Sequence, residues 1–197
     1  DWITTAKGHG AYVKIFKEEK EQTVFFMLDV SGSQDIGKEG SLKIDTAKEL
    51  CGVLTLSAIK EASQVGVYCF SDQKELYIKP ESGMKQAYKI ISGIFKLKPA
   101  SLKTHLADAI SFTLNILKRK SVIILISDFL DQDYEHGIKA LARKHDLVVL
   151  HIFDKREVSL PSLGIVPVYD KEAGKTQWIN TYSGIFKREM RDLFEEN

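Results

Sequence analysis

The stretch VFFMLDVSGSQD, from Val24 to Asp35, decides how the rest of the sequence is interpreted. It opens with an apolar run that stops at an aspartate, as expected of a strand that is buried on both faces of a parallel sheet. Asp29, Ser31 and Ser33 then occupy alternate positions, so an extended loop would point all three side chains to the same side. The sequence therefore predicts a cluster of oxygen atoms at the carboxyl end of a central strand.

Further strands are predicted where apolar runs are bounded by polar turns, and helical periodicities alternate with them, which is typical of βαβ units. The link Ser71–Lys74 is too short for a parallel crossover, so the second and third strands are expected to form a hairpin. Pro167 cannot donate a ladder hydrogen bond and limits the last strand to a sheet edge. In chain order the predicted strands are Thr23–Leu28, Gln64–Phe70, Glu75–Ile78, Val122–Ile126, Leu147–Phe153 and Ile165–Tyr169.

Amphipathic helices are predicted in the intervals, because apolar residues recur there at spacings of three and four. We expect each apolar stripe to face the core, and we assign no cofactor to any of them. The stripes are Ile44, Ala47, Cys51, Leu54 and Ala58; Met84, Tyr88, Ile91 and Phe95; Leu106, Ile110, Thr113, Leu114 and Leu117; Tyr134, Ile138, Leu141 and Ala142; and Tyr182, Ile185, Phe186, Met190, Leu193 and Phe194.

These patterns favour a single α/β domain over residues 1–197. We expect a doubly wound, mostly parallel six-stranded sheet with one antiparallel edge hairpin and helices on both faces. Numbered along the chain, the strands should lie in the order 3-2-1-4-5, with Ile165–Tyr169 on the far edge. Ligands of such sheets bind beyond the carboxyl ends of the strands, where the strand order reverses. The two loops at that point begin with DVSGS and SDFLD.

The composition argues against several classes of protein. Lysine and arginine number 28 and aspartate and glutamate 27, and no basic block is present that would follow a phosphate backbone, so nucleic acid is not indicated. No apolar run reaches the length of about 18 residues that a membrane span requires. Cys51 and Cys69 lie in apolar contexts without metal-ligand spacing. We expect them to be buried thiols in a reducing compartment, cytoplasmic for this domain.

Oxygen-bearing side chains at the switch point predict a site for Mg²⁺ or Mn²⁺. Asp29 and Asp128 each follow a central strand, and two converging carboxylates need a cation to offset their repulsion. Ser31 and Ser33 add hydroxyl oxygens, the hard ligands that Mg²⁺ selects. Thr104, expected at the start of the third helix, is the candidate for a further hydroxyl. Taken singly, Asp29, Thr104 and Asp128 are also explained as ordinary turn or capping residues.

The motif DVSGS matches the D-x-S-x-S signature of the von Willebrand factor type A domain and its metal-ion-dependent adhesion site. That family supplies a threonine from a second loop and an aspartate from a third, and Thr104 and Asp128 fall in this order. The stretches DWITTAK, VKIFKEEKEQTV, LISDFLD and REVSLPSLGIVPVYDKEAGKTQWI resemble a prokaryotic branch of these domains. That branch is family 58 of the domains of unknown function, often encoded beside MoxR-type AAA+ ATPases. The resemblance covers almost the whole chain.

The resemblance also indicates where this sequence is incomplete or unusual. In that family Asp1 and Trp2 would lie inside an early motif, so we expect the natural protein to begin further upstream, and relatives can carry amino-terminal membrane helices. Lys103 precedes Thr104 where many relatives have a glycine, and we expect it to be an exposed lysine. His105 is expected on the surface at the first turn of a helix.

The resemblance implies that the chain is a binding module. A carboxylate of a partner protein would coordinate a metal ion held by Asp29, Ser31, Ser33, Thr104 and Asp128. The implied partner is a MoxR-type AAA+ ATPase or the substrate of one. The rim expected to identify this partner consists of Gln34, Asp35, Ser101, Lys103, His105, Phe129, Asp131 and Gln132.

Two alternative functions stay open. A Mg²⁺-dependent phosphatase of the haloacid dehalogenase type also places an aspartate after a strand, but it needs a second carboxylate two positions later, where this chain has Ser31. Neither Ser31 nor Ser33 has an assigned histidine or lysine to activate it, so we expect no enzymatic activity. The other alternative is a folded, metal-free domain that acts only as a scaffold.

Overall fold

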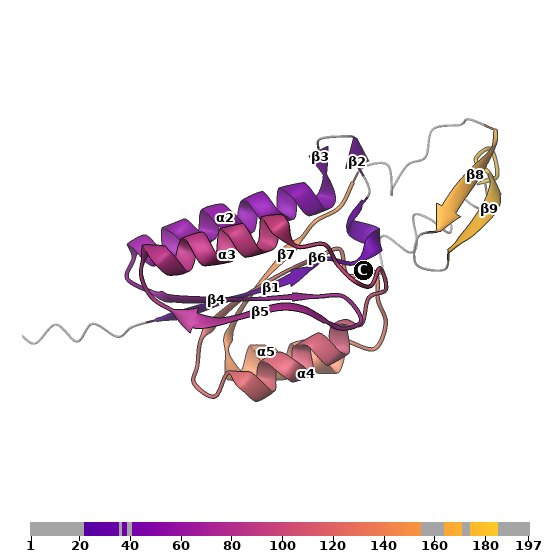
Figure 1. The fold of residues 1–197 in the computed structure, drawn as a ribbon. Coiled ribbons are helices and arrows are strands. Elements are labelled where there is room, and N and C mark those ends of the chain that lie inside the picture. Colours follow the sequence, from indigo (N-terminus) through magenta and orange to yellow (C-terminus); the bar gives the residue numbers. More distant parts are fainter. Residues whose placement is uncertain (1–21, 36, 39–40, 155–163, 171–173, 185–197) are drawn as a thin grey trace, which may run out of the picture.

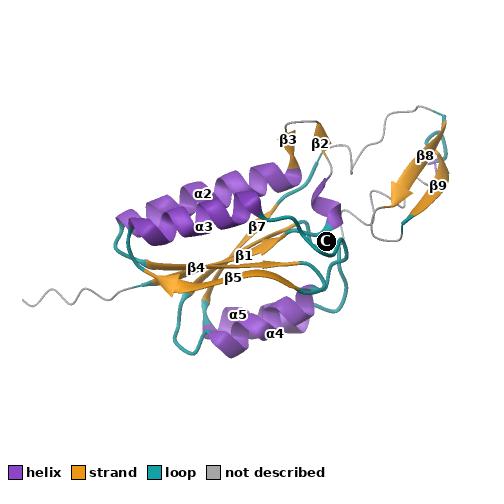
Figure 2. Cartoon of the chain, viewed as in Figure 1, coloured by secondary structure: helices purple, strands orange, loops and turns teal. Residues whose placement is uncertain are grey.

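A computed structural model of the chain shows a five-stranded sheet between two layers of helices (Figures 1 and 2). The structure describes residues 22–35, 37–38, 41–154, 164–170 and 174–184. One face of the sheet is covered by α2 (Lys43–Lys60) and α3 (Met84–Lys96), and the other by α4 (Leu106–Ile116) and α5 (Glu135–Lys144). The predicted doubly wound α/β architecture is therefore confirmed.

The spatial order of the strands is β5-β4-β1-β6-β7, which is the predicted order 3-2-1-4-5. β1 pairs in parallel with β4 and β6, β6 pairs in parallel with β7, and β4 and β5 form the predicted antiparallel hairpin. The strands are β1 (Thr23–Asp29), β4 (Gln64–Phe70), β5 (Lys74–Glu81), β6 (Val122–Ser127) and β7 (Asp146–His151).

β1 occupies the centre of the sheet because its side chains are apolar on both faces. Phe26 and Leu28 belong to the core cluster beneath α2 and α3, whereas Phe25 and Met27 belong to the cluster beneath α4 and α5. All four side chains are fully buried. Burying one such side chain contributes about 1.5–3 kcal/mol, so a central position for this run is strongly favoured.

The prediction that Ile165–Tyr169 forms a sixth strand of the main sheet is wrong. In the described part of the chain, β8 (Ile165–Asp170) pairs antiparallel with β9 (Lys175–Asn180) in a separate two-stranded sheet, in which Pro167 lies opposite Trp178. The connection between the two strands is short, so this local hairpin closes at a small cost in chain entropy. The run Lys175–Asn180 was not predicted as a strand and supplies the local partner.

The apolar stripe predicted to bury α3 is also wrong. The exposed fractions of Tyr88 and Phe95 are 64% and 52%, and it is Ala87, Ile90 and Ile94 that lie on the sheet. The helix has two apolar stripes, and the one that packs also carries Gln86. Its Nε2 donates hydrogen bonds of 2.8 Å to the carbonyl oxygens of Val65 and Lys79, beside an irregularity in the pairing of β4 with β5.

Several other predictions are tested by the structure. Cys51 and Cys69 are buried free thiols, as expected. Most of the last predicted helix falls on residues 185–197, which lie outside the described residues. A 3-10 turn, η1 (Gly32–Asp35), and a short ladder of β2 (Gly37–Lys38) with β3 (Ser41–Leu42) follow β1. None of the helices described combines the length and apolar character needed to cross a bilayer.

Candidate metal centre

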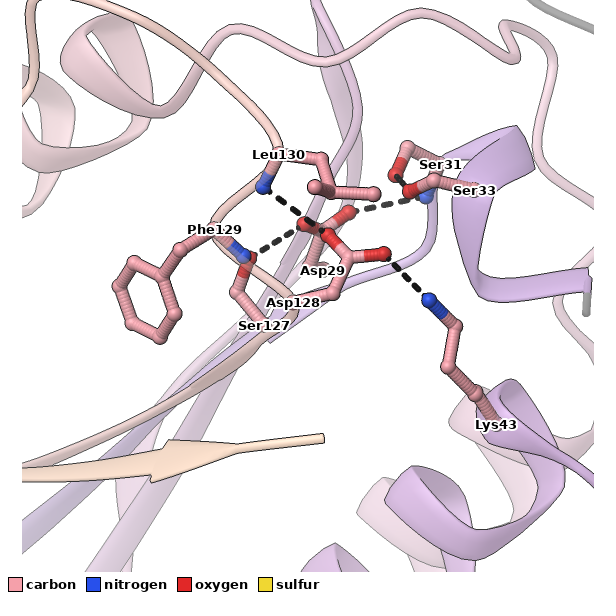
Figure 3. A network of polar contacts seen from close by, with 8 residues as sticks. All are labelled: Asp29, Ser31, Ser33, Lys43, Ser127, Asp128, Phe129 and Leu130. Carbon is pink, nitrogen blue, oxygen red and sulfur yellow. Dashed lines mark hydrogen bonds and ion pairs between the residues drawn. The ribbon is translucent and has the colours of Figure 1, made fainter. Parts of the chain in front are cut away.

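The candidate site lies where the carboxyl ends of β1 and β6 meet (Figure 3). Leu28 lies opposite Ile126 in the parallel ladder, so the next residues, Asp29 and Ser127, are neighbours at the edge of the sheet. The Ser127 hydroxyl donates a 2.6 Å hydrogen bond to Oδ2 of Asp29. Asp128 follows directly, and both aspartates are buried, with exposed fractions of 0% and 2%. The topology thus brings the DVSGS and SDFLD loops together.

Hydrogen bonds hold the Asp29 carboxylate in a single orientation. Its Oδ1 accepts a 3.0 Å hydrogen bond from the Ser31 backbone N–H, while its Oδ2 accepts from Ser127. The Ser127 hydroxyl oxygen in turn accepts a 3.0 Å hydrogen bond from the Phe129 N–H. Phe129 has a φ of +58°, a left-handed conformation that is unusual for a bulky residue. Ser127 therefore couples the orientation of Asp29 to a strained turn after β6.

Burial makes the negative charge of Asp29 costly. Desolvation, and then the charge of Asp128, raise the pKa of the Asp29 carboxyl from 3.8 to about 6, although hydrogen bonds from Ser127 and Ser31 oppose the shift. The group is therefore ionised at neutral pH, but a nearby cation would relieve this cost.

Ser31 and Ser33 present their hydroxyls side by side. The two Oγ atoms are 3.0 Å apart, and Figure 3 shows them beside the carboxylate of Asp29. Gly32 between them donates a 2.7 Å backbone hydrogen bond to the carbonyl oxygen of Leu102. A Cβ atom on Gly32 would lie 3.0 Å from the Leu102 Cβ and 3.1 Å from its carbonyl oxygen. The glycine of DVSGS therefore permits the loop that carries Thr104 to dock against this turn.

The loop before α4 is fastened to the same end of the sheet. Oε2 of Glu75 accepts a 2.8 Å hydrogen bond from the Ala100 N–H, and Oε1 accepts a 3.1 Å hydrogen bond from the Ser101 N–H. The Asp72 N–H donates to the carbonyl oxygen of Lys103 at 2.9 Å. These contacts secure the backbone on the amino-terminal side of Thr104.

Thr104 is not the first residue of a helix, contrary to the prediction. α4 begins at Leu106, and His105 occupies the capping position, where its Nδ1 accepts a 3.3 Å hydrogen bond from the Asp108 N–H. The Leu106 N–H donates to Oδ2 of Asp131, so the SDFLD loop holds the start of the helix. Thr104 thus lies between two segments that are held by hydrogen bonds. Its loop and the start of α4 contact both the DVSGS loop and the SDFLD loop.

Lys43, like Ser127, belongs to this network but was not among the residues predicted from the sequence. It is the first residue of α2, and its Nζ lies 2.7 Å from Oδ2 of Asp128. The two side chains are buried, with exposed fractions of 3% and 2%. A lysine in the first turn of a helix is disfavoured by the helix dipole, which was the one hint in the sequence of an acidic partner. Figure 3 shows Lys43 reaching Asp128 from α2.

The predicted rim residues fall into groups that differ in exposure. Gln34 and Phe129 are buried, so they do not present their side chains to a partner. The Phe129 ring packs against Tyr134 and against the exposed His151. The Nε2 atom of Gln34 is buried without a hydrogen-bond partner among the described residues. The remaining rim residues are the exposed Asp35, Lys103, His105 and Gln132 and the half-buried Ser101 and Asp131.

The types of donor in the candidate set, hydroxyl and carboxylate oxygens, are those that a magnesium or manganese ion takes. Adjacent ligands of an octahedral Mg²⁺, each about 2.0–2.1 Å from the ion, lie about 3 Å from each other. The Ser31 and Ser33 hydroxyls share a hydrogen bond of 3.0 Å, so their oxygen atoms already lie at this separation. Within the part of the chain that the structure describes, no group of three or more His, Cys, Asp and Glu side chains could hold a metal. The candidate set differs from such groups, because it combines two carboxylates with hydroxyls.

Comparison with sequence families identifies the chain. Residues 1–197 match the model of the family described as "Protein of unknown function DUF58", and the chain belongs to this family. An uncharacterized protein of Mycobacterium tuberculosis is 24% identical over 177 residues, which cover 88% of this chain and 56% of the relative. The chain therefore spans about half the length of the curated relatives it matches.

Solved structures with the same fold include two of interest. An aerotolerance-related membrane protein from Bacteroides fragilis aligns with a TM-score of 0.57 and 16% identity, over 88% of each chain. The manganese-loaded TRAP protein of Plasmodium vivax aligns with a TM-score of 0.52 and 18% identity, over 67% of this chain and 57% of that one. At these identities the similarity establishes the fold alone.

Proposed function

We propose that the chain is a metal-ion-dependent protein-binding module. Asp29, Ser31, Ser33, Thr104 and Asp128 would hold Mg²⁺ or Mn²⁺, and a carboxylate of a partner protein would complete the coordination. The observation that carries the proposal is the pair of serine hydroxyls, which are 3.0 Å apart in a hydrogen bond that a metal ion bound to both would replace. It occurs beside two buried aspartates, at the edge of the sheet where ligands of doubly wound folds bind.

The proposal assigns a different role to each kind of donor. The serine hydroxyls set the geometry, and the two aspartates supply negative charge. Each of the four carboxylate oxygens already accepts one hydrogen bond or ion pair, so a water molecule between an aspartate and the metal is compatible with the network. When bound, the metal would supply a Lewis-acid position for a partner's carboxylate.

A catalytic function is not part of the proposal. Within the described residues, the Ser31 hydroxyl is 3.0 Å from the hydroxyl of Ser33, which cannot serve as the base that a serine nucleophile requires. Ser31 also stands where a phosphatase of the haloacid dehalogenase type has its acid/base carboxylate. We therefore propose binding without turnover.

The partner is proposed from the family resemblance and from the rim. Sequence resemblance implies a MoxR-type AAA+ ATPase or its substrate. The structurally similar TRAP protein was solved in a manganese-loaded state, which supports a divalent metal in the proposed site. The exposed rim carries Lys103 and His105 next to Asp35 and Gln132. This mixture of charges suits a protein surface that presents one acidic side chain among polar neighbours.

Binding of Mn²⁺, measured by electron paramagnetic resonance, tests the proposed site. We expect the wild-type chain to bind one Mn²⁺ and Asp29→Ala to lose this binding. Asp146→Ala is the control, because Asp146 is an exposed aspartate at the start of β7, at the opposite end of the strands. A pull-down with the full-length protein should then recover a partner that is released by EDTA. Binding of Mn²⁺ that Asp29→Ala leaves unchanged would refute the site.

A metal-free scaffold is the second candidate, and one observation favours it. The ammonium of Lys43 already neutralises Asp128 in a buried ion pair. A scaffold would bind no Mn²⁺ at micromolar to millimolar concentration, and its partner would stay bound in EDTA. The same two experiments therefore separate the two candidates.

A further inference from the structure

The buried ion pair between Lys43 and Asp128 has no role in a simple metal site. Its atoms are 2.7 Å apart, and its side chains are 3% and 2% exposed. Lys43 opens α2, where the helix dipole disfavours a positive charge. The start of this helix is fixed by Asp45, whose Oδ2 accepts a 3.3 Å hydrogen bond from the Leu42 N–H. The fold therefore holds an ammonium group inside the cluster of carboxylates.

The charge of the cluster decides what it can bind. Metal coordination requires ionised carboxylates, so Asp29, Asp128 and Lys43 together carry one negative charge. A divalent cation would convert this to one positive charge, and an uncompensated charge in a buried site is unfavourable. One carboxylate from a ligand would restore neutrality. Without Lys43, the divalent cation alone would neutralise the two aspartates.

We propose that Lys43 couples metal binding to carboxylate binding. Its fixed charge weakens the binding of a divalent cation to the empty site, and this penalty is removed when a carboxylate ligand binds at the same time. The coupling is reciprocal, because a ligand that strengthens metal binding is itself bound more tightly in the presence of the metal. The inference rests on the proposed metal site and adds that the charge of Lys43 makes the affinity for the metal depend on the carboxylate.

Mn²⁺ affinity with and without acetate tests this coupling, with acetate standing for the partner's carboxylate. Chloride replaces acetate at constant ionic strength, and a protein-free titration corrects for complexes of Mn²⁺ with acetate. For the wild-type chain we expect saturating acetate to raise the affinity for Mn²⁺ at least about fivefold, at the lower end of typical couplings.

Variants at Lys43 identify the origin of the coupling. Lys43→Met should bind Mn²⁺ more tightly than the wild type in chloride, and acetate should then raise its affinity less than about twofold, below typical couplings. Lys60→Met removes an exposed lysine from the last turn of α2 and should behave like the wild type. If Lys43→Met does not fold, Lys43→Arg, which retains the charge, should retain the effect of acetate.

The outcomes distinguish this inference from the function on which it rests. If wild-type chain binds Mn²⁺ with an affinity that acetate leaves unchanged, the coupling is overturned but the metal site stands. An effect of acetate that persists in Lys43→Met, or disappears in Lys43→Arg, would show that Lys43 is not its origin. Failure of the wild type to bind Mn²⁺ in either anion would overturn both proposals.

Discussion

Asp29 combines complete burial, a neighbouring carboxylate and a pKa raised to about 6. Between pH 3.8, the ordinary pKa, and about 6, the folded state keeps a proton that the unfolded state has lost. The contribution of Asp29 to the free energy of unfolding is therefore greatest below this window and falls as the pH rises through it. Its ionised form is retained at neutral pH at the expense of stability.

Asp29→Asn should consequently separate stability from metal binding. In EDTA at pH 7, we expect the variant to melt at the same temperature as the wild type or higher, because a buried charge has been removed. At about pH 4 this difference should be much smaller, because Asp29 is then protonated in the folded state and no charge is buried. Calorimetry at the two pH values measures the effect. A fall of many degrees at pH 7 would show that the carboxylate is structural.

A substitution at Gly32 tests whether the loop that carries Thr104 must dock against the DVSGS turn. Gly32→Ala places a Cβ atom 3.0 Å from the Leu102 Cβ, so we expect the loop to move and the affinity for Mn²⁺ to fall about tenfold, as for changes around metal ligands. The control is Gly184→Ala, because a Cβ there meets no atom within 4 Å. If both variants and the wild type bind Mn²⁺ with equal affinity, the loop that carries Thr104 does not contribute to the metal site.

The site residues differ in how far sequence alone could identify them. The sequence alone predicts Asp29, Ser31 and Ser33, because three nearby residues share one side of a loop. Lys43 contacts Asp128 across 85 positions of sequence, and only its unfavourable place at a helix start hints at the contact. The burial of Gln34 was unreadable, because it depends on how η1 packs against the rest of the fold.

The loop Leu97–His105 illustrates how a neighbouring element positions a site. It is fastened by Glu75 of β5. Burial alone would raise the pKa of this carboxyl, but hydrogen bonds from Ala100, Ser71 and Ser101 hold it below its ordinary value. Glu75 thus stabilises the loop above the ordinary carboxyl pKa, and this support is lost as the pH falls through the lowered value.

Glu75→Gln should loosen this loop without removing a proposed ligand. The amide retains one acceptor oxygen, so at least one of the two backbone N–H groups loses its partner. We expect a loss of about 1 kcal/mol in the free energy of unfolding and a several-fold weaker binding of Mn²⁺. Glu81→Gln, on the same strand but exposed, is the matched control. Unchanged Mn²⁺ binding in Glu75→Gln would indicate that the loop does not contribute to the site.

The junction of α5 and β7 carries a pH dependence opposite in sign to that of Asp29. His145 is buried, and neither ring nitrogen has a hydrogen-bond partner among the described residues. Burial, and then the charge of Lys144, lower the pKa of His145 below 6.5, whereas Asp146 opposes the shift. The unfolded chain binds the proton more readily, so stability is present above pH 6.5 and falls as the pH drops below it.

His145→Leu should therefore reduce the loss of stability between pH 7.5 and 5.5. The measurement is best made in the Asp29→Asn background, which removes the opposing contribution of Asp29. Denaturant unfolding at the two pH values gives the two free energies, and we expect a smaller difference for the His145→Leu variant. An equal difference with and without His145 would mean that the histidine is hydrated in solution.

Helices and strands could be predicted where the sequence pattern allowed one interpretation. They were ambiguous where the pattern allowed two. β1 admitted a single interpretation because it is apolar on both faces. In α3 two apolar stripes competed, and Gln86 helped decide between them by satisfying the carbonyl groups of Val65 and Lys79. Such a requirement belongs to the neighbouring strands, so it cannot be read from the helix itself.

At the scale of the whole molecule, topology rules explain why the order of the main strands was predictable. Short links force hairpins, longer helical crossovers place parallel strands side by side, and the strand buried on both faces takes the centre. The pairing of β8 with β9 escaped prediction because its register depends on a local partner that lacks a strong strand pattern.

The central claim is that the two serine hydroxyls and two aspartates at the end of β1 and β6 hold a divalent cation. A crystal structure of the chain grown with Mn²⁺, with anomalous diffraction data, tests it most directly. We expect one anomalous peak about 2.0–2.3 Å from both the Ser31 and the Ser33 Oγ atoms, the range of a direct oxygen ligand. The absence of a peak there, with the Lys43–Asp128 ion pair intact, would contradict it.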